Sequence, residues 1–119
     1  RLQVRQLERS LAFYEGVLGL KKVQEMPVPF GTMHRLQFGD SFVKLIDPKK
    51  VPAAGPLGLD QGLGFRYLTF QVSNIDEVCA ACAKAGAKFD IEKTEFMPGV
   101  TIAMVRDPDD NVVEFVQRA

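Results

Sequence analysis

The sequence has a single histidine, two cysteines and no net charge. Fifteen basic and fifteen acidic residues cancel, and Lys and Arg never form a run longer than two. This balance argues against a nucleic-acid or anionic-membrane partner, which would need a basic stripe or excess. No apolar stretch reaches the roughly 18 residues of a membrane span, and no segment resembles a signal peptide. We therefore expect a cytoplasmic protein with no membrane partner.

The scarcity of cysteine also limits redox and zinc chemistry. Cys79 and Cys82 read C-A-A-C, and the sequence has no second such pair to complete a structural zinc site. Both lie on the apolar side of an expected helix, together with Ile75 and Val78. The pattern predicts buried, unpaired thiols in a reducing compartment.

The sequence does contain enough apolar residues to form the core of one folded domain. The chain has 119 residues, of which 46% are hydrophobic and 25% charged, as in ordinary soluble globular proteins.

The sequence also contains an internal repeat. "LQVRQLERS" (2–10) aligns with "FQVSNIDEV" (70–78) at an offset of 68, and "SFVKLID" (41–47) aligns with "NVVEFVQ" (111–117) at an offset of 70. Two matches in the same order predict two copies of one structural unit.

Each copy reads as a strand, a helix and three further strands. The apolar spacing of Leu7, Leu11, Tyr14 and Leu18 predicts the first helix. Asn74 is the expected N-cap of the second helix, and Gly19 and Gly86 are the expected stops. The expected strands are 2–4, 21–26, 32–38 and 41–46, then 66–72, 87–94, 100–106 and 111–117. The segment 48–64, rich in proline and glycine, is predicted to link module 1 (1–47) to module 2 (65–119).

Two motifs resemble a known superfamily. "RSLAFYEGVLGLK" after a strand and "VRDPDDNVVEFVQ" near the end look like the vicinal oxygen chelate proteins, which include glyoxalase I, bleomycin resistance proteins and extradiol dioxygenases. The resemblance covers essentially the whole chain. It implies an α+β fold of two βαβββ modules, whose curved mixed sheets form a pocket with the helices outside. It also implies a homodimer.

The resemblance further implies where a divalent metal would be held. Catalytic members of the family use His or Gln, Glu, His and Glu, on the first and last strands of each module. Of these positions, the last is Glu114, its counterpart in the first module is Lys44, and the His of the second module is Tyr67. The fourth would lie before Arg1. Lysine offers no acceptor and repels a dication, so we expect a degraded metal site with Glu114 as the remaining ligand and no cofactor.

Strand alternation indicates which side chains share a face. Phe65, Tyr67 and Thr69 alternate along one strand, and Lys44 and Glu114 lie at equivalent places in theirs. We expect these five residues to line an apolar pocket, with Lys44, Tyr67 and Glu114 forming a polar cluster in place of the metal. The alternative is that Lys44 and Glu114 form a structural ion pair only.

The strand "TMHRLQF" (32–38) leaves a choice between two polar faces. Leu36 and Phe38 share the face of His34, which favours Arg35 as the residue facing the pocket. There it would bind an anionic group of a ligand. A solvated surface Arg35 is the alternative.

Two functions follow from these expectations. The first is a metal-free protein that binds a small organic, anionic ligand, as the drug-sequestering resistance proteins of the family do. The second is a lyase, isomerase or dioxygenase of the glyoxalase I type. It would use a metal ligand upstream of Arg1, or else Lys44, Tyr67 and Glu114 without a metal, with Glu114 as general base.

Overall fold

The chain folds into two compact units, Arg1–Ala53 and Ala54–Ala119. The computed structural model describes residues 1–55 and 57–119. Pro56, within the predicted linker, lies outside the described residues. Between Pro48 and Tyr67 the described residues form no helix or strand.

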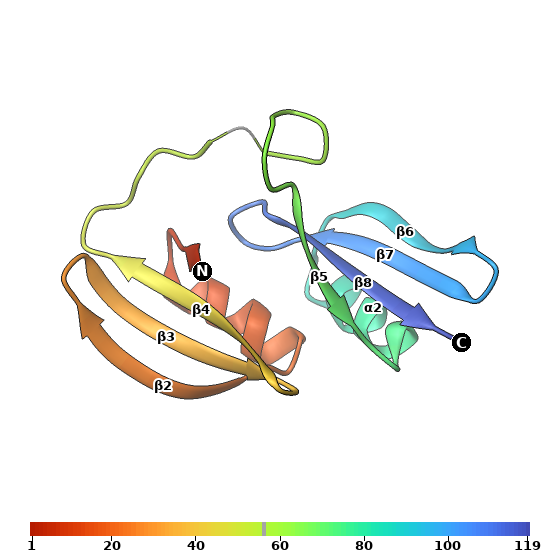
Figure 1. Ribbon diagram of the computed structural model, residues 1–119, viewed down its shortest axis with the longest axis horizontal. Helices are drawn as coiled ribbons and strands as arrows, with labels where there is room; N and C mark the ends of the chain where they lie inside the picture. Colours follow the sequence, from red (N-terminus) through yellow and green to blue (C-terminus); the bar gives the residue numbers. More distant parts are fainter. Residues whose placement is uncertain (56) are drawn as a thin grey trace. The chain divides into compact units, whose positions relative to one another are not determined.

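The first unit has the predicted order of elements (Figure 1). The sheet runs β1-β4-β3-β2, with β1 parallel to β4 and the other neighbours antiparallel. Its elements are β1 (Leu2–Gln3), α1 (Leu7–Leu11), the π-helix η1 (Ala12–Val17), β2 (Lys21–Val28), β3 (Gly31–Phe38) and β4 (Ser41–Pro48).

The second unit repeats this topology with the order β5-β8-β7-β6 (Figure 1). The register repeats too, because Leu2 pairs with Leu45 and its counterpart Phe70 pairs with Phe115. The α+β fold of two βαβββ modules is therefore confirmed. The elements are β5 (Tyr67–Gln71), α2 (Ile75–Lys84), β6 (Phe89–Met97), β7 (Val100–Arg106) and β8 (Val112–Arg118).

The first helix differs from the prediction in its pitch. After Leu11 it becomes a π-helix, in which the N–H of Leu18 donates to the carbonyl of Phe13 at 2.9 Å. The wider turn brings the adjacent Phe13 and Tyr14 inward together, and both are buried. The predicted stripe had placed only Tyr14 of this pair in the core. Leu7, Leu11 and Leu18 are half-buried.

The second helix begins and ends where the sequence predicts. Asn74 occupies the N-cap, but its side chain donates to Glu77 and makes no capping bond. Instead, the Gln117 side chain on β8 accepts the N–H of Ile75 at 2.8 Å. Gly86 follows the last turn with φ of 79°, the left-handed conformation expected of a stop.

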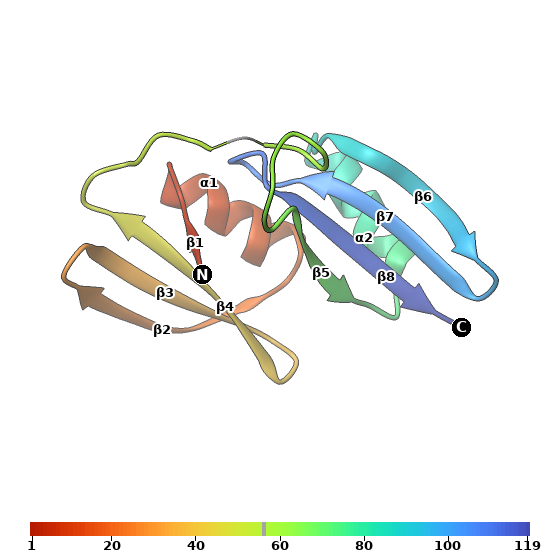
Figure 2. The ribbon, with the colours of Figure 1, turned by 45° about the horizontal axis from the view of Figure 1, so that its top comes forward.

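The Gln117 bond identifies the face of the second sheet that packs on α2. Gln117, Phe115 and Val113 alternate onto one side of β8, so that side faces the helix. Figure 2 shows α2 running along the sheet formed by β7 and β8. Phe115 contacts Phe70 here, with ring centroids 6.5 Å apart.

The two cysteines lie on α2 and are free. Cys82 is fully buried and Cys79 half-buried, close to the prediction. Burial raises the pKa of the Cys82 thiol to about 11, which keeps it protonated at neutral pH. None of the helices in residues 1–55 and 57–119 has the length and apolar character needed to cross a bilayer.

Candidate functional site

Glu114 lies at the centre of β8, on the face of the sheet opposite α2. Its neighbours on that face of β8 are Val112 and Val116, both buried, and Met104 pairs with it across β7. On the other side Glu114 pairs with Thr69 of β5. The Thr69 hydroxyl donates to Glu114 Oε1 at 2.9 Å. An isolated carboxylate in an apolar strand thus has a hydrogen-bond partner across the parallel β5–β8 ladder.

Tyr67 lies on the same face as Thr69, two residues earlier on β5. It pairs with Val112, and half of its surface is exposed. Strand alternation therefore brings three of the predicted site residues of the second unit, Tyr67, Thr69 and Glu114, to one face. Of these three residues, Thr69 and Glu114 are hydrogen bonded to each other.

In the first unit, Lys44 lies directly opposite Arg35 in the β3–β4 ladder. The Arg35 guanidinium stacks on the Phe42 ring, with its carbon 3.9 Å from the ring centroid. Because paired residues of antiparallel strands point the same way, Arg35, Lys44 and Phe42 share a face. Two cations and an aromatic ring meet there.

His34 points to the other face of β3, where it pairs with Leu45. It is buried, and its Nδ1 lies 3.5 Å from Glu25 Oε1. Glu25 also accepts a hydrogen bond from Lys22 at 2.5 Å, and this bond lowers the pKa of the Glu25 carboxyl. His34 thus belongs with the core, as the sequence pattern favoured, while Arg35 shares the face of Lys44.

Phe65 does not share the strand geometry that the prediction assumed. β5 begins at Tyr67, so alternation along the strand does not extend back to residue 65. The Phe65 side chain is fully exposed, at the rim of a hollow. The residues around that hollow are Leu57, Gly58, Phe65, Arg66, Asp110, Asn111 and Val112.

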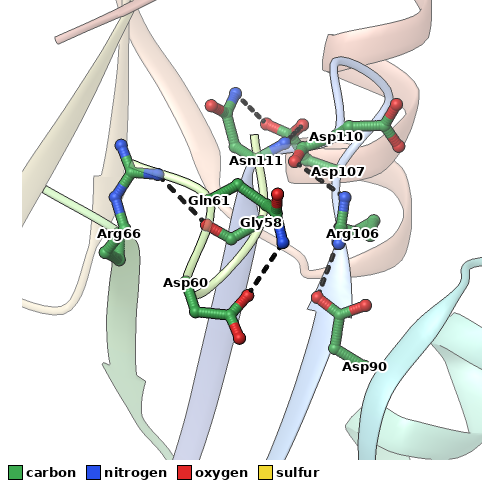
Figure 3. A network of polar contacts seen from close by, with 9 residues as sticks. All are labelled: Gly58, Asp60, Gln61, Arg66, Asp90, Arg106, Asp107, Asp110 and Asn111. Carbon is green, nitrogen blue, oxygen red and sulfur yellow. Dashed lines mark hydrogen bonds and ion pairs between the residues drawn. The ribbon is translucent and has the colours of Figure 1, made fainter. Parts of the chain in front are cut away.

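The acidic turn between β7 and β8 is held by one carboxylate. Asp107 is buried, and it accepts the N–H groups of Asp109 and Asn111, each at 2.9 Å. It also accepts the Asn111 side-chain amide at 3.0 Å (Figure 3). Asp110 adopts a left-handed conformation with φ of 63°. These bonds fix the entry into β8, two residues before Glu114.

Two groups of polar contacts that the sequence did not predict lie in the segment before β5 and beside this turn (Figure 3). Arg66 donates to the carbonyls of Gly58, Leu63 and Phe65. Arg106 donates to Asp90 at 2.6 Å, and this bond raises the pKa of Arg106. The Asp90–Arg106 pair is mostly shielded from solvent, with 12% and 17% of the side chains exposed. Arg66 thus contacts two residues of the predicted linker, Gly58 and Leu63.

The positions at which the resemblance implies metal ligands carry side chains of different chemistry in this chain. Glu114 is a carboxylate held by Thr69, Tyr67 supplies a phenol, and the counterpart position in the first unit carries Lys44 beside Arg35. An ammonium group has no lone pair for a metal and repels it. Across the described residues, no group of three or more His, Cys, Asp or Glu side chains is placed to hold a metal.

Comparisons with known proteins agree with this topology. Residues 1–115 match the model of the glyoxalase/bleomycin resistance protein/dioxygenase superfamily, and the chain belongs to this family. It is 28% identical to the lactoylglutathione lyase of Neisseria meningitidis serogroup A, over 98% of this chain and 86% of that protein.

Two solved structures show the same fold. The glyoxylase/bleomycin resistance protein/dioxygenase domain from Frankia sp. EAN1pec has a TM-score of 0.84 at 24% identity, over 99% of this chain and 87% of that one. TnmS3, an antibiotic binding protein from Streptomyces sp. CB03234, has a TM-score of 0.74 at 22% identity, over 99% and 91%. The proteins similar to this chain thus include one named as a lyase and one, alike in fold, named as an antibiotic binding protein.

Proposed function

We propose that this protein binds a small organic ligand without a metal, on the sheet faces that carry Glu114 and Lys44. The observation that carries the proposal is the Thr69–Glu114 hydrogen bond. The carboxylate at the family's last metal position is engaged by a hydroxyl, in the middle of a face lined by Val112, Val116 and Met104. An apolar surface with a few placed polar groups is typical of small-molecule sites.

The charges at the metal positions also support binding without a metal. Where the family places another carboxylate ligand, this chain has Lys44, with Arg35 opposite it. These cations could supply positive charge to an anionic ligand, which is the electrostatic role that a metal has elsewhere. The predicted cluster of Lys44 with Tyr67 and Glu114 joins residues of the two units and stays a prediction.

Substitution of Glu114 tests the proposal directly. In a screen of small organic fragments by NMR, we expect binders that shift the backbone amide signals of Thr69 and Glu114. E114Q keeps the shape but removes the charge, and T69V removes the hydroxyl. Each should change the affinity of such a binder about tenfold, the usual effect of a hydrogen bond to a charged group.

The matched control is E95Q, because Glu95 is an exposed carboxylate on β6. It should leave the affinity unchanged. The proposal is wrong if no fragment perturbs the β5 and β8 signals, or if E114Q and E95Q have equal effects on the fragments that do.

The second candidate is a lyase that acts on lactoylglutathione. It is favoured by the 28% identity to lactoylglutathione lyases, which extends over 98% of this chain. In such an enzyme Glu114 could act as a general base. If the full-length protein forms lactoylglutathione and E114Q does not, the protein is a lyase and the proposal of ligand binding alone is wrong.

A further inference from the structure

The face of the first sheet that carries Lys44 is positively charged. Arg35 and Lys44 are directly opposite each other on β3 and β4, so their charges are close and alike. The remaining charged position on this face, by register, is Lys21, opposite Gln37. Within the described strands of the sheet, no carboxylate shares the face. Like charges gathered without a counterion disfavour one another and attract an anion.

The acidic residues of this unit's strands lie elsewhere. Glu25 pairs with His34 on the opposite face, where it is also bonded to Lys22. Asp47 pairs with Thr32, likewise on the opposite face. The positive charge beside Phe42 is therefore not neutralised by the strands that carry it.

Arg35 is also held in a fixed orientation. Its guanidinium carbon lies 3.9 Å from the centroid of the Phe42 ring. Its Nε atom is buried and has no hydrogen-bond partner among the described residues. A guanidinium stacked on a ring keeps its donors at its edge, where a planar acceptor can take two of them in parallel.

We infer that Arg35 and Lys44 bind the carboxylate of a small organic acid, whose apolar body packs on the neighbouring Phe42. The inference rests on the proposed ligand-binding function and names the chemical class of the ligand. Arg35 supplies the planar pair of donors, and Lys44 supplies a second charge from the facing strand. Phe42, which is 44% exposed, contributes apolar surface on the same face, since it pairs with Gln37. A carboxylate fits the flat edge of a stacked guanidinium better than a neutral polar group does.

The test uses a matched pair of probes, 2-naphthoate and its neutral amide, 2-naphthamide. Each is titrated into the full-length protein, with the backbone amide signals of β3 and β4 followed by NMR. We expect 2-naphthoate to bind about tenfold more tightly than 2-naphthamide, as a charge-assisted pair requires. The difference should disappear in R35Q and shrink in K44Q. K50Q, a control at an exposed lysine beyond β4, should behave as the wild type does.

Added salt provides a second readout, because it should weaken the binding of 2-naphthoate and leave that of 2-naphthamide unchanged. Equal binding of the two probes, or a carboxylate preference that survives in R35Q, would overturn the inference. So would the absence of any shift in β3 and β4. If neutral fragments still perturb Thr69 and Glu114 in these cases, the proposed ligand-binding function stands and only the carboxylate site is wrong.

Discussion

Replacing Phe115 with alanine is expected to lower the free energy of unfolding by about 3–5 kcal/mol. Only 1% of Phe115 is exposed, and it lies at the centre of the second sheet, paired with Phe70 on β5 and Ala103 on β7. Removing the ring eliminates its contact with Phe70 and leaves a cavity beneath α2. Urea unfolding followed by circular dichroism measures the change.

The matched control is F65A. The chain carries this second phenylalanine in the same unit, but its side chain is fully exposed. Its removal should change the stability by less than about 0.5 kcal/mol. Equal losses in F115A and F65A would mean that Phe115 is not the centre of the core.

Replacing Asp107 with alanine is expected to lower the free energy of unfolding by about 3 kcal/mol. The carboxylate accepts three hydrogen bonds within the turn, and the side chain is buried. Its removal leaves the N–H groups of Asp109 and Asn111 without this acceptor. Because the turn leads into β8, the amide protons of Glu114 and Thr69 should also exchange faster with solvent.

D107N provides a graded comparison, since the asparagine carbonyl can still accept the two backbone N–H groups. It should lose less stability than D107A. If D107A is as stable as the wild type, the turn does not depend on this carboxylate.

The fold could be predicted from the sequence because the same pattern of residues occurs in both halves of the chain. The offsets of 68 and 70 residues correspond to the same register in both sheets, with Leu2 opposite Leu45 and Phe70 opposite Phe115. The glycine stops after both helices were also predictable, because Gly19 and Gly86 each adopt a φ of 79°. These signals are local or repeated, so a single sequence is enough to identify them.

Features that depend on contacts distant in the sequence were not predicted. The cap of α2 comes from Gln117, 42 residues away, and not from the adjacent Asn74. The Asp90–Arg106 pair joins two strands, and Arg66 donates to the carbonyl of Gly58, eight residues earlier. The π-helical turn that buries Phe13 beside Tyr14 also has no local sequence pattern.

The candidate site was predictable to the extent that strand alternation determines it. Alternation placed Thr69 and Glu114 on one face, and they are hydrogen bonded. It also favoured Arg35 over His34 as the residue facing the pocket; the register places Arg35 on the face of Lys44, and the pocket stays a prediction. It failed at Phe65, which precedes the strand. The predicted Lys44–Glu114 contact and the homodimer stay predictions.

Metal content is the measurement that tests the central claim most directly. The full-length protein is produced in medium supplemented with zinc and nickel, purified without chelators and analysed by mass spectrometry of the elements, with E114Q in parallel. We predict far less than one divalent ion per chain, and no difference between the wild type and E114Q. A stoichiometric ion in the wild type that is lost in E114Q would show that Glu114 is a metal ligand, and would contradict binding without a metal.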